Sequence, residues 1–216
     1  MKTDGYRREK RRARSLKETH ELLDEIWHDG QYYTWIDGII QCGLGDWAEG
    51  PALLDKYPPT DIRYLAVDPI HRYAFETWAA GFRGSIIQGC LWSETGRIFK
   101  LQDFRSKTSI LDTEKRRGEF KAHSLTLDDA VTYTNYSAKS ILLWMDVEGA
   151  EFEILKGAKN TLENVSVIVC EVKDKPRIPG WKSTSEVVVE LNEYGFSMIK
   201  RVADNGLFVR SSRVEK

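Results

Sequence analysis

One run of apolar residues constrains the fold more than any other part of the chain. Residues 141–145 read Ile-Leu-Leu-Trp-Met without alternation, between Ser140 and Asp146. This pattern predicts a strand covered on both faces, as in the middle of a parallel sheet. Glu148 and Glu151 follow, and residues 152–158 have apolar side chains at helical spacing. The strand therefore delivers acids to its carboxyl end, where open α/β sheets bind ligands, although such acids also suit the first turn of a helix.

Strands and helices are expected to alternate along the whole chain. The expected strands are 33–42, 62–67, 85–92, 97–101, 141–145, 165–172, 196–202 and 206–210. The expected helices are 15–28, 50–57, 73–81, a short one from 125, one from about 151 to 162, and one at 183–194. This order predicts an α/β fold with a doubly wound, mostly parallel sheet. Asp204-Asn205-Gly206 predicts a closing antiparallel hairpin, and residues 107–121 are expected to form a mobile loop or lid.

Length and charge predict one domain with a basic arm. The chain has 216 residues, enough for a single buried core. Residues 1–17 carry a net charge of +6 within a chain of net charge −1, so the remainder carries −7. We expect residues 1–14 to form a disordered basic arm, which could contact a polyanion such as RNA, and residues 15–216 to form one domain.

The cysteines and the hydropathy pattern predict a cytoplasmic protein. Cys42, Cys90 and Cys170 lie in or beside apolar runs and lack metal-binding spacing, so we expect reduced core residues. No apolar run is long enough to cross a membrane. No apolar segment follows the basic N-terminus, so no signal peptide is expected. The sequence leaves the oligomeric state open.

A glycine loop and an acid indicate a nucleoside site. Residues 41–47, Gln-Cys-Gly-Leu-Gly-Asp-Trp, follow the first strand, and Asp68 ends the next one. In a doubly wound fold that acid lies beside the glycine loop and can accept hydrogen bonds from two ribose hydroxyls. Ala48 stands where a dinucleotide fingerprint has its third glycine, which disfavours NAD. S-adenosylmethionine, a nucleoside cofactor without a pyrophosphate, fits better.

A longer motif resembles a known family. Residues 143–158 read Leu-Trp-Met-Asp-Val-Glu-Gly-Ala-Glu-Phe-Glu-Ile-Leu-Lys-Gly-Ala. This resembles the signature of the FkbM family of S-adenosylmethionine-dependent methyltransferases, roughly Lys-Ile-Asp-Val-Glu-Gly-Ala-Glu followed by Leu-Lys-Gly-Ala. Further similarity lies at residues 67–69, 96, 126–129, 169–171 and 206–210, so the match spans about residues 30–210.

The chain departs from that pattern at three positions. Gln41 stands for an acid, Trp47 for a glycine and Trp144 for a lysine. We expect Asp46 or Asp37 to replace the lost acid.

The resemblance implies a class I, Rossmann-like methyltransferase that methylates a hydroxyl of a small molecule or sugar. The candidate cofactor-binding residues are Gln41, Cys42, Gly43, Gly45, Asp46, Asp68, Pro69, Gly89, Cys90, Leu91 and Asp146. An alcohol is a weak nucleophile, so a base or metal that removes its proton is useful. The candidate catalytic residues are Asp146, Glu148, Glu171 and His123, although His123 also fits an ordinary exposed loop histidine. Asp146 with Glu171 could also hold a divalent cation.

Two other functions stay open at this point. A ribose 2′-O-methyltransferase acting on RNA would use the basic arm and the basic run 115–117, with Lys17, Asp146 and Lys173 in three of four catalytic places. No strand position supplies its expected late glutamate. The altered glycine loop also fits a catalytically inactive binding module. We further expect Trp47 and Trp92 to touch the adenosine, and Glu151 to face the helix surface or pair with a lysine.

Overall fold

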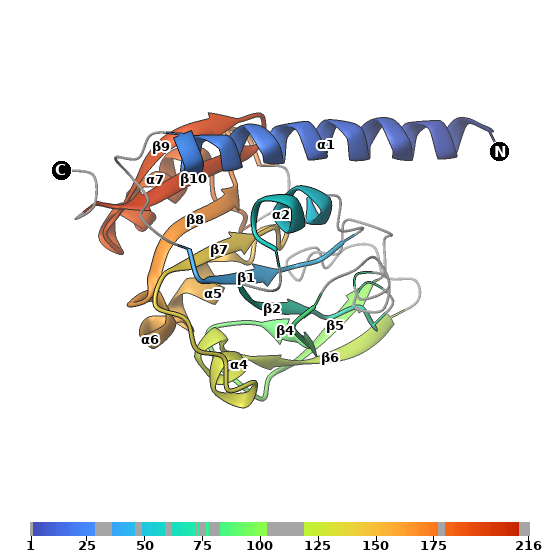
Figure 1. Ribbon diagram of the computed structural model, residues 1–216. Helices are drawn as coiled ribbons and strands as arrows, with labels where there is room; N and C mark the ends of the chain where they lie inside the picture. Colours follow the sequence, from blue (N-terminus) through green and yellow to red (C-terminus); the bar gives the residue numbers. More distant parts are fainter. Residues whose placement is uncertain are drawn as a thin grey trace.

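The computed structural model describes residues 2–28, 36–45, 49–58, 62–71, 73, 77, 83–102, 119–176 and 180–211. Its centre is a seven-stranded sheet in the order β3-β2-β1-β7-β8-β10-β9 (Figure 1). The strands are β1 Gly38–Cys42, β2 Arg63–Asp68, β3 Ser85–Gln88, β7 Ile141–Met145, β8 Val165–Glu171, β9 Phe196–Val202 and β10 Asn205–Arg210. Strands β3, β2, β1, β7 and β8 are parallel, and β10 is antiparallel to both its neighbours. The predicted doubly wound sheet with a closing antiparallel hairpin is confirmed.

Alternation along each strand divides the core into two layers. In β7, Leu142 and Trp144 face a layer with helices α1 (Lys2–His28) and α2 (Gly50–Lys56). Ile141, Leu143 and Met145 face the other layer. That layer contains α4 Leu127–Tyr133, α5 Glu151–Lys156, α6 Lys159–Leu162 and α7 Thr184–Glu193. The apolar run of β7 is therefore explained by helices on both faces of the sheet.

The predicted strand 85–92 is wrong, because the chain changes sheets at Gly89. Strand β3 ends at Gln88, and β4 (Cys90–Leu91) joins a separate sheet in the order β4-β6-β5. Gly89 donates its N–H to the carbonyl of Asp68, 3.1 Å away. A Cβ at Gly89 would lie 2.6 Å from Cδ2 of Leu125, so a larger residue here would require the Leu125 side chain to move.

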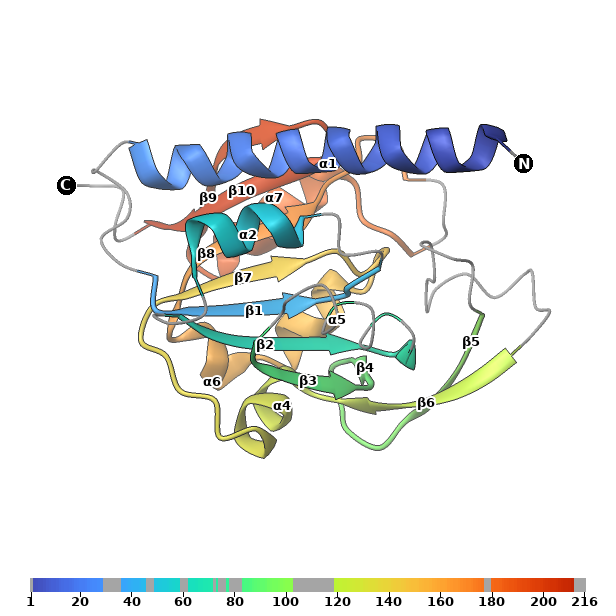
Figure 2. The same ribbon diagram turned by 45° about the vertical axis from the view of Figure 1, so that its right-hand side comes forward.

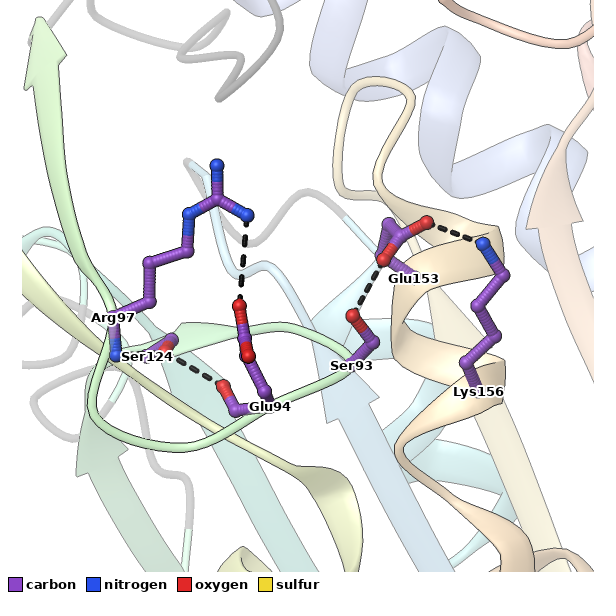
Figure 3. A network of polar contacts seen from close by, with 6 residues as sticks. All are labelled: Ser93, Glu94, Arg97, Ser124, Glu153 and Lys156. Carbon is purple, nitrogen blue, oxygen red and sulfur yellow. Dashed lines mark hydrogen bonds and ion pairs between the residues drawn. The ribbon is translucent and has the colours of Figure 1, made fainter.

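The small sheet is completed by β5 (Ile98–Gln102) and β6 (Glu119–Leu125), which are antiparallel. Residues 119–121, expected in a loop, are therefore in a strand; residues 103–118 lie outside the described residues. Figure 3 shows how the turn before β5 meets α5. Ser93 Oγ donates to Glu153 Oε2 over 2.6 Å, and Ser124 Oγ donates to the carbonyl of Glu94 over 2.7 Å. The first bond joins the turn to α5 of the main body, and the second joins the turn to β6 of the small sheet.

The helix expected from about 151 to 162 is two helices. Chain direction changes at Gly157, where a Cβ would lie 2.5 Å from the carbonyl oxygen of Trp92. The close backbone contact therefore requires glycine and ends α5. Asp128 then caps α6 by accepting from the N–H groups of Asn160 (3.0 Å) and Thr161 (2.8 Å).

The N-terminal helix α1 is longer than predicted. The expected helix 15–28 is its second half, and residues 2–14, expected to be disordered, continue it. Lysine, arginine and glutamate have high helix propensity, and Arg14 Nε lies 2.6 Å from Glu18 Oε1 one turn on. The division between arm and domain stays a prediction. Within the described ranges, no helix combines the length and the apolar character that a membrane crossing requires.

Candidate active site

A cavity opens where β1, β2 and β7 end at their carboxyl edge. Its lining residues are Gly43, Gly45, Val67, Asp68, Pro69, Ile70, Tyr73, Gly89, Cys90, Leu91, Leu101, Asp146, Val147, Glu148, Ala150 and Ile154. The set includes eight of the predicted cofactor residues, namely Gly43, Gly45, Asp68, Pro69, Gly89, Cys90, Leu91 and Asp146. The topology thus brings these residues together, and their roles in binding stay predictions.

The two glycines of the loop after β1 serve different purposes. Gly43 has φ +81°, and its Cβ would lie 2.0 Å from the carbonyl oxygen of Asp146. It therefore allows the end of β1 to lie directly against the end of β7. Gly45 has φ +50° and open space where its Cβ would be. A ligand can approach the backbone there, which fits the predicted role of this loop.

Asp68 fixes the loop from the next strand. Its side chain is buried, and Oδ2 accepts from the N–H of Leu44 over 2.7 Å while Oδ1 accepts from the N–H of Ile70, also over 2.7 Å. A weaker contact of 3.4 Å joins Oδ2 to the N–H of Gly45. The carboxylate therefore holds the glycine loop and the turn after β2 around one cavity wall.

Three predicted residues do not line the cavity or cannot be placed. Gln41 and Cys42 are fully buried in the sheet, one on each face, and neither lines the cavity. Their position follows from the register of β1, whose last residue is Cys42, so that only the following residue reaches the edge. Asp46 lies outside the described residues, as does Trp47.

Of the two acids expected to replace the one lost at Gln41, Asp37 is in the wrong place. It accepts from the N–H groups of Lys139 and Ser140 at the amino end of β1, the edge opposite the cavity. Asp46 lies outside the described residues, so that alternative stays a prediction. Glu49, which the sequence analysis missed, is buried just before α2 and accepts a hydrogen bond from Nε2 of Gln41. A buried amide needs such a partner.

Three carboxylates gather beside the cavity. One carboxylate oxygen from each of Asp146, Glu148 and Glu171 lies within 4.8 Å of the other two, and the first two residues line the cavity. Glu171 Oε1 lies 2.6 Å from Lys173 Nζ, whereas its Oε2 is buried without a hydrogen-bond partner among the described residues. Burial and the nearby Asp146 raise the pKa of Glu171 to about 7, against the opposing effect of Lys173. The cluster thus holds a carboxyl poised to exchange a proton near neutral pH.

Glu151 is not on the surface, contrary to expectation. It is 3% exposed and accepts from the N–H of Gly149 over 3.3 Å. Burial raises its pKa to about 8, opposed by its backbone hydrogen bonds. Its place at the start of α5, directly under the turn that follows β7, explains why it is covered. Glu151 is therefore largely protonated at neutral pH.

Other candidates lie away from the cavity. His123 is exposed in β6, opposite Ile98 of β5, and is not in the predicted loop. Trp92 is buried against the ring of Phe99, with centroids 4.9 Å apart, and does not line the cavity. The basic run 115–117 lies outside the described residues. The lining residues that sequence analysis missed include Ile70 and Val147, which directly follow named motifs, and Leu101, which the small sheet brings in from afar.

Fold and site together define a class of protein. A parallel sheet closed by an antiparallel hairpin, with a glycine loop and a strand-end acid around one cavity, is the arrangement of class I, Rossmann-like methyltransferases. A family profile described as "Methyltransferase FkbM domain" matches residues 51–198. The chain therefore belongs to the FkbM methyltransferase family. No curated protein matches the chain in sequence.

One solved structure shows the same fold, and two others resemble the chain more weakly. Methyltransferase FkbM from Methylobacillus flagellatus KT superposes with a TM-score of 0.56 and 11% identity, over 85% of this chain and 46% of that one. The chain thus spans about half the length of that protein. A SAM-dependent methyltransferase from Aquifex aeolicus gives a TM-score of 0.48 and 13% identity, over 90% of this chain and 92% of that one. An O-methyltransferase family protein from Burkholderia thailandensis gives a TM-score of 0.48 and 11% identity, over 88% of this chain and 54% of that one.

Proposed function

We propose that this methyltransferase uses S-adenosylmethionine to methylate a hydroxyl group of a small molecule or sugar. The observation that carries the proposal is the carboxylate cluster at the cavity, in which Glu171 keeps a buried oxygen without a partner among the described residues. A hydroxyl donor would satisfy that oxygen. The residues also suit the cofactor, because Gly45 leaves open space and Asp68 lies at the end of β2.

The residues of this chain have separable tasks in that reaction. The glycine loop and Asp68 hold the nucleoside, and Asp146 and Glu148 place negative charge at the cavity. S-adenosylmethionine, when bound, supplies a methyl group on a positively charged sulfur. Glu171 would accept the proton of the acceptor hydroxyl, on the carboxylate oxygen that has no partner among the described residues. A pKa of about 7 suits a base at neutral pH.

The first experiment tests the cofactor by calorimetry with S-adenosylhomocysteine. We expect binding in the micromolar range, and Asp68→Asn should weaken it about tenfold, because an amide can no longer accept hydrogen bonds with both of its polar atoms. The matched control is Asp55→Asn, which changes an exposed acid of α2. Absence of heat with the native chain would support an inactive module instead.

The second experiment tests the acceptor chemistry. Methyl-labelled S-adenosylmethionine is incubated with monosaccharides, nucleosides and phenols, and label that survives mild alkali marks an ether rather than an ester. Glu171→Gln should lower transfer about 100-fold or more and leave S-adenosylhomocysteine binding within about twofold. Exposed Glu163→Gln is the control. If EDTA abolished transfer and Mg²⁺ restored it, a cation held by Asp146 and Glu171 would replace the base.

A further inference from the structure

The second half of α1 is anchored to the body. Leu22 and Leu23 are fully buried, and Ile26 is nearly so, in the layer that contains α2. Two ion pairs of 2.7 Å, Lys56 with Asp24 and Lys200 with Glu25, join the same part of α1 to α2 and β9. The first half of the helix is thus a continuation of a fixed element.

That first half extends over the edge where the cavity opens. In both views the N-terminal end of α1 reaches past the carboxyl ends of β1, β2 and β7 (Figures 1 and 2). Residues that line the cavity come from these same strand ends. Anything bound along the first half of α1 is therefore held on the side of the molecule where the methyl group would be transferred.

The first half is also where the positive charge of the chain is concentrated. Residues 2–14 contain seven lysines and arginines and two acids, within a chain whose residues after 17 carry −7. Five of these cations, Arg7, Arg8, Lys10, Arg11 and Arg12, fall within six consecutive residues of the sequence. Lys10 is exposed. The charge is thus distributed along the helix and is not confined to one position.

This distribution selects the kind of partner. A single phosphate needs converging groups, whereas positive charge spread along a helix suits a chain of phosphates. A membrane-surface helix needs an apolar face, and residues 2–14 include only Tyr6 and Ala13 as apolar side chains. Deoxyribose lacks the 2′-hydroxyl that RNA offers to a methyl donor.

We propose that the first half of α1 binds RNA and presents it to the cavity as the polymer that carries the methylated hydroxyl. This inference rests on the proposed function and names its substrate class. The acidic body repels a polyanion, so α1 directs where the RNA docks and which part of it reaches Glu171.

Binding is tested by fluorescence anisotropy with a short labelled single-stranded RNA over a range of KCl concentrations. We expect Arg7→Gln/Arg11→Gln to weaken binding about tenfold and to reduce the slope of log K against log salt by about 1.4. The matched control, Lys139→Gln/Lys159→Gln, removes the same charge from exposed positions at the opposite edge. The inference would be overturned if both double variants lost the same RNA affinity, or if the native chain showed no salt-dependent RNA binding. Polyglutamate is added as a competitor. If it displaced the labelled RNA as well as unlabelled RNA of the same total charge, the RNA proposal would be overturned in favour of an acidic protein as the partner.

Transfer of labelled methyl groups separates this inference from the proposed function. RNA should gain alkali-stable label, DNA of the same sequence should not, and the arm variant should label RNA at least about fivefold more slowly with unchanged S-adenosylhomocysteine binding. Intact cofactor binding with label entering only small hydroxylated compounds overturns the RNA substrate and leaves the proposed function standing. If the native chain did not bind S-adenosylhomocysteine, the proposed function would be refuted. RNA binding is measured separately and does not depend on that result.

Discussion

The carboxylate of Glu171 lies 2.6 Å from the ammonium group of Lys173, two residues further along the chain. The same ammonium lies 4.0 Å from the centroid of the Trp181 ring, which is largely buried. Lys173 is therefore held in place from two sides. Burial and Asp146 raise the pKa of Glu171, and Lys173 partly offsets them by lowering it.

We predict that Lys173→Met raises the pKa of Glu171 by about one unit, because the buried carboxylate loses its only described cation. The readout is carbon NMR of the glutamate carboxyls across pH, and Lys173→Arg should restore most of the native value. Lys182→Met is the control, since Lys182 pairs with Glu186, 3.5 Å away. An unchanged titration of Glu171 in Lys173→Met would show that the contact has no influence on the acid.

Glu151 should make the protein less stable as the pH rises. Its pKa is raised from 4.5 to about 8 on folding, so between these values the folded state keeps a proton that the unfolded chain has lost. The free energy of unfolding therefore falls as pH increases through that window and levels off above it. Glu151→Gln removes this dependence.

We expect Glu151→Gln to match the native chain near pH 4 and to be more stable by on the order of 5 kcal/mol near pH 9. Urea unfolding at both pH values measures the difference. Glu163 is exposed, so Glu163→Gln should change the stability by the same small amount at both pH values. A Glu151→Gln variant that is less stable at pH 9 would mean that the ionised carboxylate is needed in the folded state.

The two glycines of the loop should respond differently to alanine. In Gly43→Ala the new Cβ meets the backbone of Asp146 at 2.0 Å, so we expect a loss of at least about 3 kcal/mol. Gly45→Ala has only its positive φ to accommodate, which costs about 1 kcal/mol. That methyl group occupies open space at the cavity, so S-adenosylhomocysteine binding should weaken instead. Thermal unfolding and calorimetry separate the two effects, and equal destabilisation would refute the distinction.

Local patterns were sufficient to predict the elements that face the site. The apolar run before Asp146, the glycines after β1 and the acid at the end of β2 each follow from residues close in sequence. Their meeting at one edge follows from parallel topology. The helix expected at 183–194 was likewise confirmed, because its start is fixed by a capping box of Ser183 and Glu186, a contact within one turn.

Contacts between distant residues explain what the sequence analysis missed. The change of sheet at Gly89 depends on the pairing of β4 with β6, which is more than 30 residues further along the chain. The burial of Glu151 depends on neighbours from other strands, and a signature with several acids does not say which of them is covered. Cys42 is buried and the next residue, Gly43, lines the cavity. This difference between consecutive residues is set by where β1 ends.

The separation of β4, β5 and β6 from the main sheet has an evolutionary consequence. Cys90 and Leu101 line the cavity from this small sheet, yet they pack in their own cluster with Ala122 and Phe99, and Phe120 also packs against the layer of α1 and α2. Mutations of Ala122 or Phe99 can reshape one wall of the cavity while the two main layers keep their packing. Selection for a new acceptor could therefore act on the small sheet first, at little risk to the fold that holds the cofactor.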